Sequence, residues 1–337
     1  MAQNMAAAKS QTANSEKVTN PQSAQLRNVV ILGGGISGLT AAVYTARASL
    51  QPLVICGPED GGQLTLTTEV ENFPGFEHGV LGTELVGQAK KQAARFGAEF
   101  VTGFVKTIKQ TGNGNDNFTI TLHDDKTIES RTVIIATGAS ARWLNIESEK
   151  QYKGRGVSTC ATCDGFFYRG KEVLIVGGGD SAMEEAIFLT RFASKVTVIH
   201  RRDSLRASKI MQDKFFATPK TAIVWNSEIS QVIGDGKKVT GATLRDTITG
   251  KLTDINCAGI FVAVGHVPNT SMIDKSLIDV DANGYIVTDR FTKTKTPGLF
   301  ASGDVQDSRY RQAITAAGSG CSAAIEVERY LAHNSHN

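Results

Sequence analysis

The sequence of 337 residues predicts an α/β protein with two domains, each built on a parallel sheet. Two observations lead to this prediction. An apolar run, a glycine-rich turn and a helical pattern follow one another near the N-terminus, and the same succession returns in the middle of the chain. Each copy is then followed by a strand-rich stretch that leads into another apolar strand.

The first copy begins with the apolar run VVIL, which is typical of a buried parallel strand. Gly33, Gly35 and Gly38 form a G-x-G-x-x-G motif, and LTAAVYTARAS and PLVIC follow as a helix and a strand. This context predicts a dinucleotide-binding loop. Gly33 permits the tight turn, Gly35 lets the backbone approach a pyrophosphate, and Gly38 lets helix and strand pack closely.

The second copy has the same order, with VLIV before the turn and KVTVIH after the helix. Gly177, Gly179 and Ala182 occupy the places of the three glycines. The strand-rich stretches are FVKTIKQTGNGNDNFTITLHDDKTIES after the first copy and SEISQVIGDGKKVTGATLRDTITGKLTD after the second. We therefore expect two Rossmann-like dinucleotide-binding domains, each with a parallel sheet and a strand-rich crossover.

The nucleotide of the second domain is predicted from the end of its second strand. An NAD site usually has an acidic residue there for the ribose, but this chain has His200, Arg201 and Arg202, with Arg206 shortly after. Guanidinium groups would hold a 2′-phosphate by charge-assisted hydrogen bonds. The second domain is therefore expected to bind NADPH.

The first copy alone leaves its nucleotide undetermined, because its second strand ends in Ile55-Cys56-Gly57 without an acidic residue. The C-terminal stretch decides it, since an apolar strand ends there in Gly303-Asp304 and a helical run starts near Arg311. Such an aspartate suits the ribityl chain of a flavin, and a helix N-terminus suits negative charge on its ring. We expect FAD between the first copy and this stretch.

Cys160 and Cys163 form a C-x-x-C pair, which is close enough in the chain for a redox disulfide. A metal site is not expected, because there is no second C-x-x-C motif and the histidines lack ligand spacing. Cys56, Cys257 and Cys321 are expected to be small buried residues.

The cysteine pair precedes the first strand of the second domain and is therefore assigned to it. Two crossings between the domains, at 138–142 and 265–269, are the candidate hinges. The expected divisions are a tail at 1–26, the FAD domain at 27–141 and 268–333, and the inserted NADPH domain at 142–267.

Composition narrows the class of protein. The net charge of +3 gives no reason to expect a nucleic-acid partner, and no apolar run approaches the ~18 residues of a membrane span. The odd, scattered cysteines fit a reducing compartment, so a cytoplasmic location is expected. The polar tail is expected to lack a fold. A transit peptide remains an alternative, although no arginine precedes Arg27.

Several motifs together resemble one known family. GGGISGLTAAVY, GGQLTLTTEVENFPGF, ATGASARWL, CATCDGFF, GGGDSAMEEA, HRRDSLRAS and GDVQDSRYRQAITAAGSGC are similar to stretches of the low-molecular-weight NADPH-dependent thioredoxin reductases. The resemblance extends from about Asn28 to Leu331. It implies a homodimer in which electrons pass from NADPH to FAD, then to the C-x-x-C disulfide and to thioredoxin.

The resemblance also implies roles for individual residues. Cys163 would lie against the flavin, Cys160 would attack the thioredoxin disulfide, and Asp164 would protonate a departing thiolate. The implied FAD contacts are Gly33, Gly35, Ile36, Ser37, Gly38, Gln63, Asn72, Thr137, Gly138, Gly303, Asp304, Arg311, Gln312 and Ala313. The implied NADPH contacts are Gly177, Gly179, Asp180, Ser181, Ala182, His200, Arg201, Arg202 and Arg206.

Some members of the resembled family carry a fused thioredoxin domain, whereas this chain stops six residues after Leu331. Thioredoxin is therefore expected as a separate partner. Three alternatives remain at this point. They are a flavoprotein disulfide reductase with a glutaredoxin-like or peroxidase partner, a ferredoxin- or flavodoxin-linked NADPH reductase, and a non-catalytic nucleotide-binding protein. The cysteine pair counts against the second, whose flavin needs no disulfide.

Overall fold

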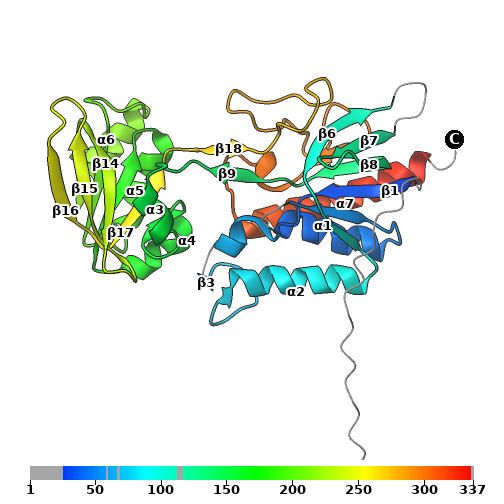
Figure 1. The fold of residues 1–337 in the computed structure, drawn as a ribbon, viewed down its shortest axis with the longest axis horizontal. Coiled ribbons are helices and arrows are strands. Elements are labelled where there is room, and N and C mark those ends of the chain that lie inside the picture. The colour runs from blue at the N-terminus through cyan, green and yellow to red at the C-terminus, as the bar shows by residue number, and fades with distance from the viewer. Residues whose placement is uncertain (1–25, 58–59, 67–68, 112–116, 335–337) are drawn as a thin grey trace, which may run out of the picture.

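Two bodies of sheet and helix lie side by side and are joined by a thin ribbon of two strands (Figure 1). The computed structural model describes residues 26–57, 60–66, 69–111 and 117–334. The tail expected at 1–26 therefore lies outside the described residues, apart from Leu26.

The first body is built on a seven-stranded sheet in the order β5-β2-β1-β8-β7-β6, with β19 beside β8. Strands β1, β2, β5, β19 and the end of β8 are parallel, as the first sequence repeat predicts. The strands are β1 (Arg27–Leu32), β2 (Leu53–Cys56), β5 (Glu99–Thr102), β6 (Val105–Gln110), β7 (Phe118–Leu122), β8 (Thr127–Ile135) and β19 (Leu299–Ala301).

Both faces of this sheet are covered, which explains why β1 is apolar from Val29 to Leu32. Val29 and Ile31 face a core cluster shared with α1 and α7, whereas Val30 and Leu32 face a second cluster with Ile108. The helices and smaller elements of this body are α1 (Ile36–Arg47), α2 (Gly82–Arg95), α7 (Ala313–Asn334), η1 (Gly62–Leu66), η3 (Gly303–Val305) and the hairpin β3 (Glu69–Val70) with β4 (Val80–Leu81).

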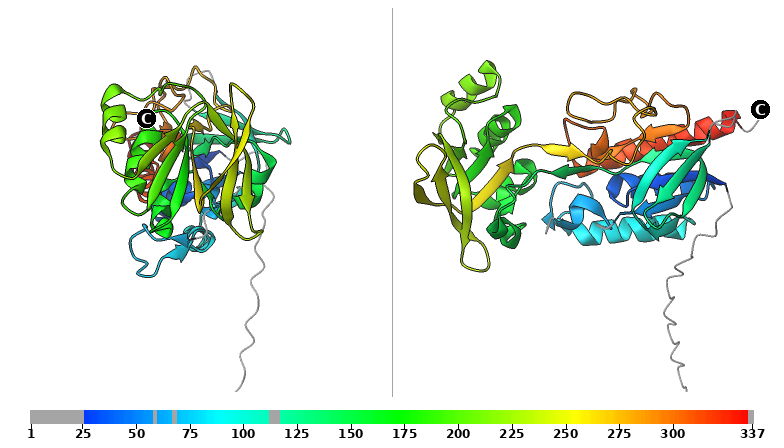
Figure 2. Two further views of the ribbon diagram at one scale, coloured as in Figure 1. Left: turned by 90° about the vertical axis from the view of Figure 1, so that its left-hand side faces the viewer. Right: turned by 45° about the horizontal axis from the view of Figure 1, so that its top comes forward.

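The second body has a fully parallel sheet in the order β10-β17-β11-β12-β13 and a separate antiparallel sheet β14-β15-β16, seen at the far end from α7 in Figure 2. Its strands are β10 (Val157–Ser158), β11 (Glu172–Gly177), β12 (Lys195–Ile199), β13 (Thr221–Val224), β14 (Ser227–Gly234), β15 (Val239–Asp246), β16 (Leu252–Asn256) and β17 (Gly259–Ala263). Its helices are α3 (Glu147–Tyr152), α4 (Ala161–Asp164), η2 (Gly165–Tyr168), α5 (Asp180–Leu189) and α6 (Lys209–Ala217).

The predicted fold class is confirmed, but the two crossovers differ. In the second body the crossover strands form a sheet of their own. In the first body they extend the main sheet, because β8 is nine residues long and pairs with β7 as well as with the parallel strands β1 and β19. Its first half pairs antiparallel with β7, and its second half pairs parallel with β1.

The ribbon between the bodies consists of β9 (Ala139–Ala141) and β18 (His266–Pro268), which pair antiparallel with each other. Backbone hydrogen bonds extend the pairing at both ends, from Arg142 to Gly265 and from Asn269 to Gly138. The side chain of Thr137 also donates to the carbonyl of Asn269 at 2.7 Å. The two crossings therefore form one hydrogen-bonded unit.

Helices α1 and α7 approach each other closely at Ser37. A Cβ atom on Gly320 would lie 2.2 Å from the carbonyl oxygen of Ser37, and one on Gly303 would lie 2.8 Å from its Cβ. The hydroxyl of Ser37 is hydrogen-bonded to that of Ser302 at 2.9 Å. The N-terminal glycine loop is thus joined to the C-terminal segment through a contact that leaves no room for larger residues.

This contact generates a stability prediction. We expect Gly320→Ala to lower the free energy of unfolding by about 1–3 kcal/mol, because the added methyl group would overlap the backbone of α1. Gly318→Ala is the matched control on the same helix, since a Cβ atom there meets nothing within 4 Å. It should stabilise the helix by up to about 1 kcal/mol. Denaturant unfolding checks both, and equal stability of the two variants would contradict the close packing.

Candidate active site

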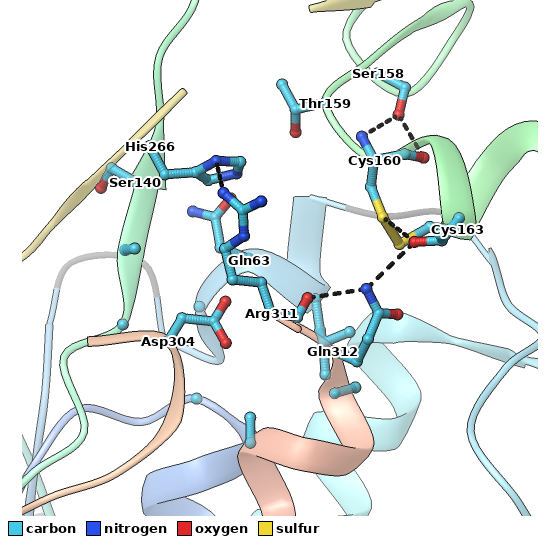
Figure 3. Close-up of a pocket in the computed structure, with 18 of the residues that line it drawn as sticks. Gln63, Ser140, Ser158, Thr159, Cys160, Cys163, His266, Asp304, Arg311 and Gln312 are labelled. Carbon is cyan, nitrogen blue, oxygen red and sulfur yellow. Dashed lines mark hydrogen bonds between the residues drawn. A yellow bond between two sulfur atoms is a disulfide. The ribbon is translucent and has the colours of Figure 1, made fainter. Parts of the chain in front are cut away.

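One large cavity of about 1540 Å³ lies where the two bodies meet. Its lining comes from the first glycine loop, the C-terminal segment before α7 and the C-x-x-C segment of the second body (Figure 3). The residues from the predicted FAD set that line it are Gly33, Gly35, Ile36, Ser37, Gln63, Asn72, Thr137, Gly138, Gly303, Asp304, Arg311, Gln312 and Ala313. Cys160, Cys163 and Asp164 line the same cavity.

The first glycine loop has the geometry of a phosphate-binding turn. Gly33 has a φ of +119°, and a Cβ atom there would lie 2.2 Å from the carbonyl oxygen of Ala136. A Cβ atom on Gly38 would lie 2.0 Å from the carbonyl oxygen of Gly33. At Gly35 the nearest atom is 3.9 Å away, so the backbone is open to a ligand. Gly35 precedes α1 without a side-chain cap, which leaves N–H groups for an anion.

Cys160 and Cys163 form a disulfide with a Cα–Cα distance of 5.3 Å. Cys160 stands immediately before α4, and its backbone N–H donates to the hydroxyl of Ser158 at 3.0 Å. Gly165 lets this segment pack on α5, because a Cβ atom there would lie 2.9 Å from the side chain of Leu189. The disulfide is thus fixed on the second body and faces the loops of the first.

Polar side chains connect the two bodies beside the disulfide. The amide of Gln312 donates to the hydroxyl of Thr162 at 3.3 Å, and this hydroxyl lies 3.3 Å from the sulfur of Cys160. Asn72 donates to the other end of the Gln312 side chain at 3.2 Å. In Figure 3 Gln312 extends toward the disulfide from the start of α7. The predicted flavin-contacting residue Gln312 therefore also contacts the redox segment, and Asn72 holds the other end of its side chain.

Arg311 is one of the positive charges that line the cavity, and it contacts the ribbon. Its backbone has a φ of +49°, and its guanidinium group donates to Nδ1 of His266 at 2.6 Å (Figure 3). Burial, and then the charge of Arg311, lower the pKa of His266 to about 4, so this ring is neutral near pH 7. Burial and the negative charge of Asp307 raise the pKa of Asp304 to about 6, against the effect of Arg311.

Asp164 follows Cys163 directly and has the properties of a proton donor. Burial raises the pKa of its carboxyl group above the ordinary range, although a hydrogen bond with Ser158 acts in the opposite direction. A carboxyl group with a raised pKa keeps its proton to a higher pH. It can therefore supply a proton to a neighbouring thiolate.

The second glycine loop mostly faces away from this cavity. Ser181 lines the cavity, whereas the other eight residues of the predicted NADPH set do not: Gly177, Gly179, Asp180, Ala182, His200, Arg201, Arg202 and Arg206. A Cβ atom on Gly177 would lie 2.6 Å from the Cβ of Ala182, and at Gly179 nothing lies within 4 Å. This loop is thus tight at Gly177 and open at Gly179, as the first loop is at Gly33 and Gly35.

His200 is buried and binds two loops together. Its Nδ1 lies 2.8 Å from the carbonyl oxygen of Gly177, and its Nε2 lies 2.9 Å from that of Ser204. Gly178 has no room for a side chain, because a Cβ atom would lie 2.2 Å from the His200 ring. Nearby, Asp180 accepts hydrogen bonds from the backbone and hydroxyl of Ser208.

The three arginines that follow His200 are exposed, whereas His200 is buried. Arg201, Arg202 and Arg206 are exposed, and none of their guanidinium groups forms an ion pair within the described part of the chain. The backbone of Arg206 donates to the carbonyl of Gly178 at 2.7 Å. The positive charges are therefore held beside the second glycine loop and remain available to an anion.

The sequence prediction missed three residues of this site. They are His266 in the ribbon, Thr162 between the cysteines, and Glu185 on α5, which also lines the cavity. The only signal for them was their position: His266 is in a predicted hinge, and Glu185 is in the helix after the second glycine loop.

The chain can now be compared with known proteins. Residues 27–320 match the family of pyridine nucleotide-disulphide oxidoreductases. A thioredoxin reductase of Streptomyces clavuligerus is 52% identical over 309 residues, which cover 91% of this chain and 94% of the relative. The chain belongs to the thioredoxin reductases of this family. A solved thioredoxin reductase from Streptococcus pyogenes MGAS5005 is 42% identical, with a TM-score of 0.86 and coverage of 91% and 99%.

A second solved thioredoxin reductase agrees less well in overall shape. The Lactococcus lactis protein in the FR conformation is 40% identical with coverage of 91% and 99%, yet its TM-score is 0.61. Identity and coverage are almost the same as for the Streptococcus protein, so a different fold cannot explain the lower score. The matched residues of the two proteins therefore superpose less closely as one unit than those of the Streptococcus protein.

Two further properties of the described residues bear on the site. None of the helices within them is long and apolar enough to cross a membrane. The same residues contain no group of three or more His, Cys, Asp or Glu side chains that could hold a metal ion.

Proposed function

We propose that this chain reduces the disulfide of thioredoxin with NADPH, and that electrons pass through FAD and the Cys160–Cys163 disulfide. The observation that carries this proposal is the shared cavity. The disulfide of one body faces the phosphate-binding loop of the other, while the loop with the arginine cluster lies outside the cavity. A disulfide and two dinucleotide loops are the parts that such an electron path requires.

FAD fits the first body. The open backbone at Gly35 suits the pyrophosphate, and the tight contacts of Gly33 and Gly38 keep the loop at the start of α1. Asp304 is at the end of β19, within the cavity, where its carboxyl group suits hydroxyl groups of a ribityl chain. Gly303, Arg311, Gln312 and Ala313 would form the wall behind the flavin ring.

A flavin held by these residues would supply the hydride-accepting and two-electron chemistry that links nicotinamide to a disulfide. The chain's own residues then act on sulfur and protons. Cys163 is assigned to the flavin side, and Cys160 to the attack on thioredoxin, where its thiolate forms a mixed disulfide. The departing sulfur needs a proton, and Asp164 holds one because burial raises the pKa of its carboxyl group.

NADPH is proposed for the second glycine loop. The pyrophosphate would lie at Gly179, where α5 begins without a side-chain cap. Arg201, Arg202 and Arg206 would hold the 2′-phosphate. His200 is too buried to contact the phosphate easily, and we propose that it positions the loop that carries the arginines.

The two half-reactions require a rotation of one domain against the other. In the present arrangement the disulfide faces the flavin loops, and the arginine cluster does not reach the cavity. Hydride transfer requires reacting atoms within roughly 3–3.5 Å, so nicotinamide needs a different arrangement. We propose domain boundaries at 141/142 and 267/268, with the hinges at 138–142 and 265–269 around the ribbon.

The other parts of the proposal concern the assembly. We propose a homodimer with thioredoxin as a separate protein substrate, as expected from the resemblance of the sequence. A cytoplasmic location remains our prediction, and import through residues 1–26 is the alternative.

The electron path generates the first functional prediction. Purified protein should be yellow, and NADPH should bleach the flavin. NADPH oxidation should be fast only with oxidised thioredoxin. Cys160→Ser and Cys163→Ser should each reduce thioredoxin turnover to background while the flavin is still bleached. Cys257→Ser is the control, because this thiol is buried and burial raises its pKa to about 12. Near-normal turnover in either active-pair variant would refute the assignment.

The second functional prediction concerns the arginine cluster. Replacing Arg201 and Arg202 with Ala removes two charge-assisted contacts of roughly 1.5–3 kcal/mol each. The value of kcat/KM for NADPH should therefore fall by about 100-fold or more. Use of NADH should change little. Lys195→Ala, which removes an exposed cation from the other end of β12, is the control. His200→Ala should instead weaken the binding of both NADPH and NADH, because it removes the contacts that hold the loops at Gly177 and Ser204. Equal losses for NADPH and NADH in the arginine variant would mean that the cluster does not recognise the 2′-phosphate.

A further inference from the structure

A carboxylate that the electron path does not use lies next to the disulfide segment. Glu185 on α5 lines the cavity. Its Oε2 atom is the one buried side-chain oxygen or nitrogen without a hydrogen-bond partner among the described residues. A buried ionised carboxylate is costly unless it has a hydrogen bond, a counter-charge or a proton. If Glu185 loses a nearby counter-charge when its surroundings change, its carboxyl group has to gain a hydrogen bond or a proton instead.

The same carboxylate lies beside the backbone between the two cysteines. The backbone N–H of Ala161, which follows Cys160 and begins α4, is near enough to lower the pKa of the Glu185 carboxyl group. Ala161 is 1% exposed, so little water reaches this N–H group. Glu185 and the disulfide segment thus belong to one packed region of the second body.

The charge that acts on Glu185 comes from the other body. Burial raises the pKa of the Glu185 carboxyl group to about 7, whereas the positive charge of Arg311 lowers it, and so does the Ala161 N–H group. Glu184, its exposed neighbour on α5, has a small raising effect. The other titratable groups of α4 and the ribbon that line this cavity are Asp164 and His266.

His266 does not compete with Glu185 for protons near pH 7. Its Nδ1 accepts a hydrogen bond from Arg311, and its pKa is lowered to about 4. This contact places the guanidinium group against the ribbon (Figure 3). Arg311 itself belongs to the first body, just before α7, and therefore stays with the flavin loops when the second body turns.

We propose that Glu185 is a positioning residue for the disulfide, and that it takes up a proton when the two domains turn out of the present arrangement. This rests on the rotation in the proposed function. In the present arrangement the charge of Arg311 and the N–H group of Ala161 both favour the carboxylate. After rotation Arg311 is absent, and a proton from solvent forms an O–H bond on the carboxylate. The proton returns to solvent when the domains turn back, so no other bond changes.

The direction of the pH dependence follows from linkage. Arg311 makes the present arrangement bind the Glu185 proton less tightly than the rotated one. Lowering the pH therefore shifts the equilibrium toward the rotated arrangement. The shift occurs between the pKa of about 7 in the present arrangement and the higher pKa in the rotated one. Each unit of difference between the two corresponds to about a tenfold change in the equilibrium constant.

The test compares Glu185→Gln with Glu184→Gln in the flavin-loaded protein. The glutamine at 185 retains an oxygen atom beside Ala161 but cannot titrate, whereas Glu184→Gln removes the same charge one residue away. Small-angle X-ray scattering between pH 6 and 9 reports the arrangement without turnover. We expect the wild type and Glu184→Gln to move away from the present arrangement as pH falls, and Glu185→Gln to show no such change.

Infrared pH titration provides a second readout. The wild-type spectrum minus that of Glu185→Gln should contain a carboxylic-acid band that titrates near pH 7 or above. Glu185→Ala should slow thioredoxin reduction at every pH, and Glu185→Gln should restore most of the rate. A pH-dependent arrangement that persists in Glu185→Gln, or a difference spectrum without this band, would overturn the proposal. Failure of NADPH-dependent thioredoxin reduction in the wild type would instead refute the proposed function, whatever the titration gives.

Discussion

The close contact of Ser37 with the C-terminal segment is the constraint on which the arrangement of the chain depends. Gly303 and Gly320 leave no room between α7 and the start of α1, and Ser302 is hydrogen-bonded to Ser37. The first and last parts of the chain must therefore fold as one body. The chain therefore leaves the first body to form the second body and then returns to it. The two crossings pair with each other in the β9–β18 ribbon.

One side chain, Arg311, affects the pKa values of several titratable groups in the cavity. Arg311 contacts His266 and changes the pKa values of His266, Asp304 and Glu185. All three groups are desolvated, so each responds strongly to a charge in this low-dielectric space. A movement of one body relative to the other would therefore alter the protonation of Glu185 without any change in the local fold.

Most of the fold could be predicted from the sequence, because the glycine motifs describe local turns. Gly38 meets Gly33, and Gly177 meets Ala182, within the same motif, whereas Gly33 is also tight against Ala136, far along the chain. The position of the arginine cluster outside the cavity could not be predicted, since it depends on how two bodies are oriented. The role of His200 could not be predicted either. Its motif suggests a phosphate contact, but packing buries its ring between the carbonyl groups of Gly177 and Ser204.

The pairing of β9 with β18 has a mechanical consequence. Two separate linkers would let the second body wander in many directions, whereas two strands that are hydrogen-bonded to each other can mainly twist about their common axis. The disulfide and the nicotinamide would then each reach the flavin by a rotation about nearly one axis. The effective concentration of the disulfide at the flavin loops stays high and independent of protein concentration. In the proposed function the ribbon would thus keep the electron transfer intramolecular.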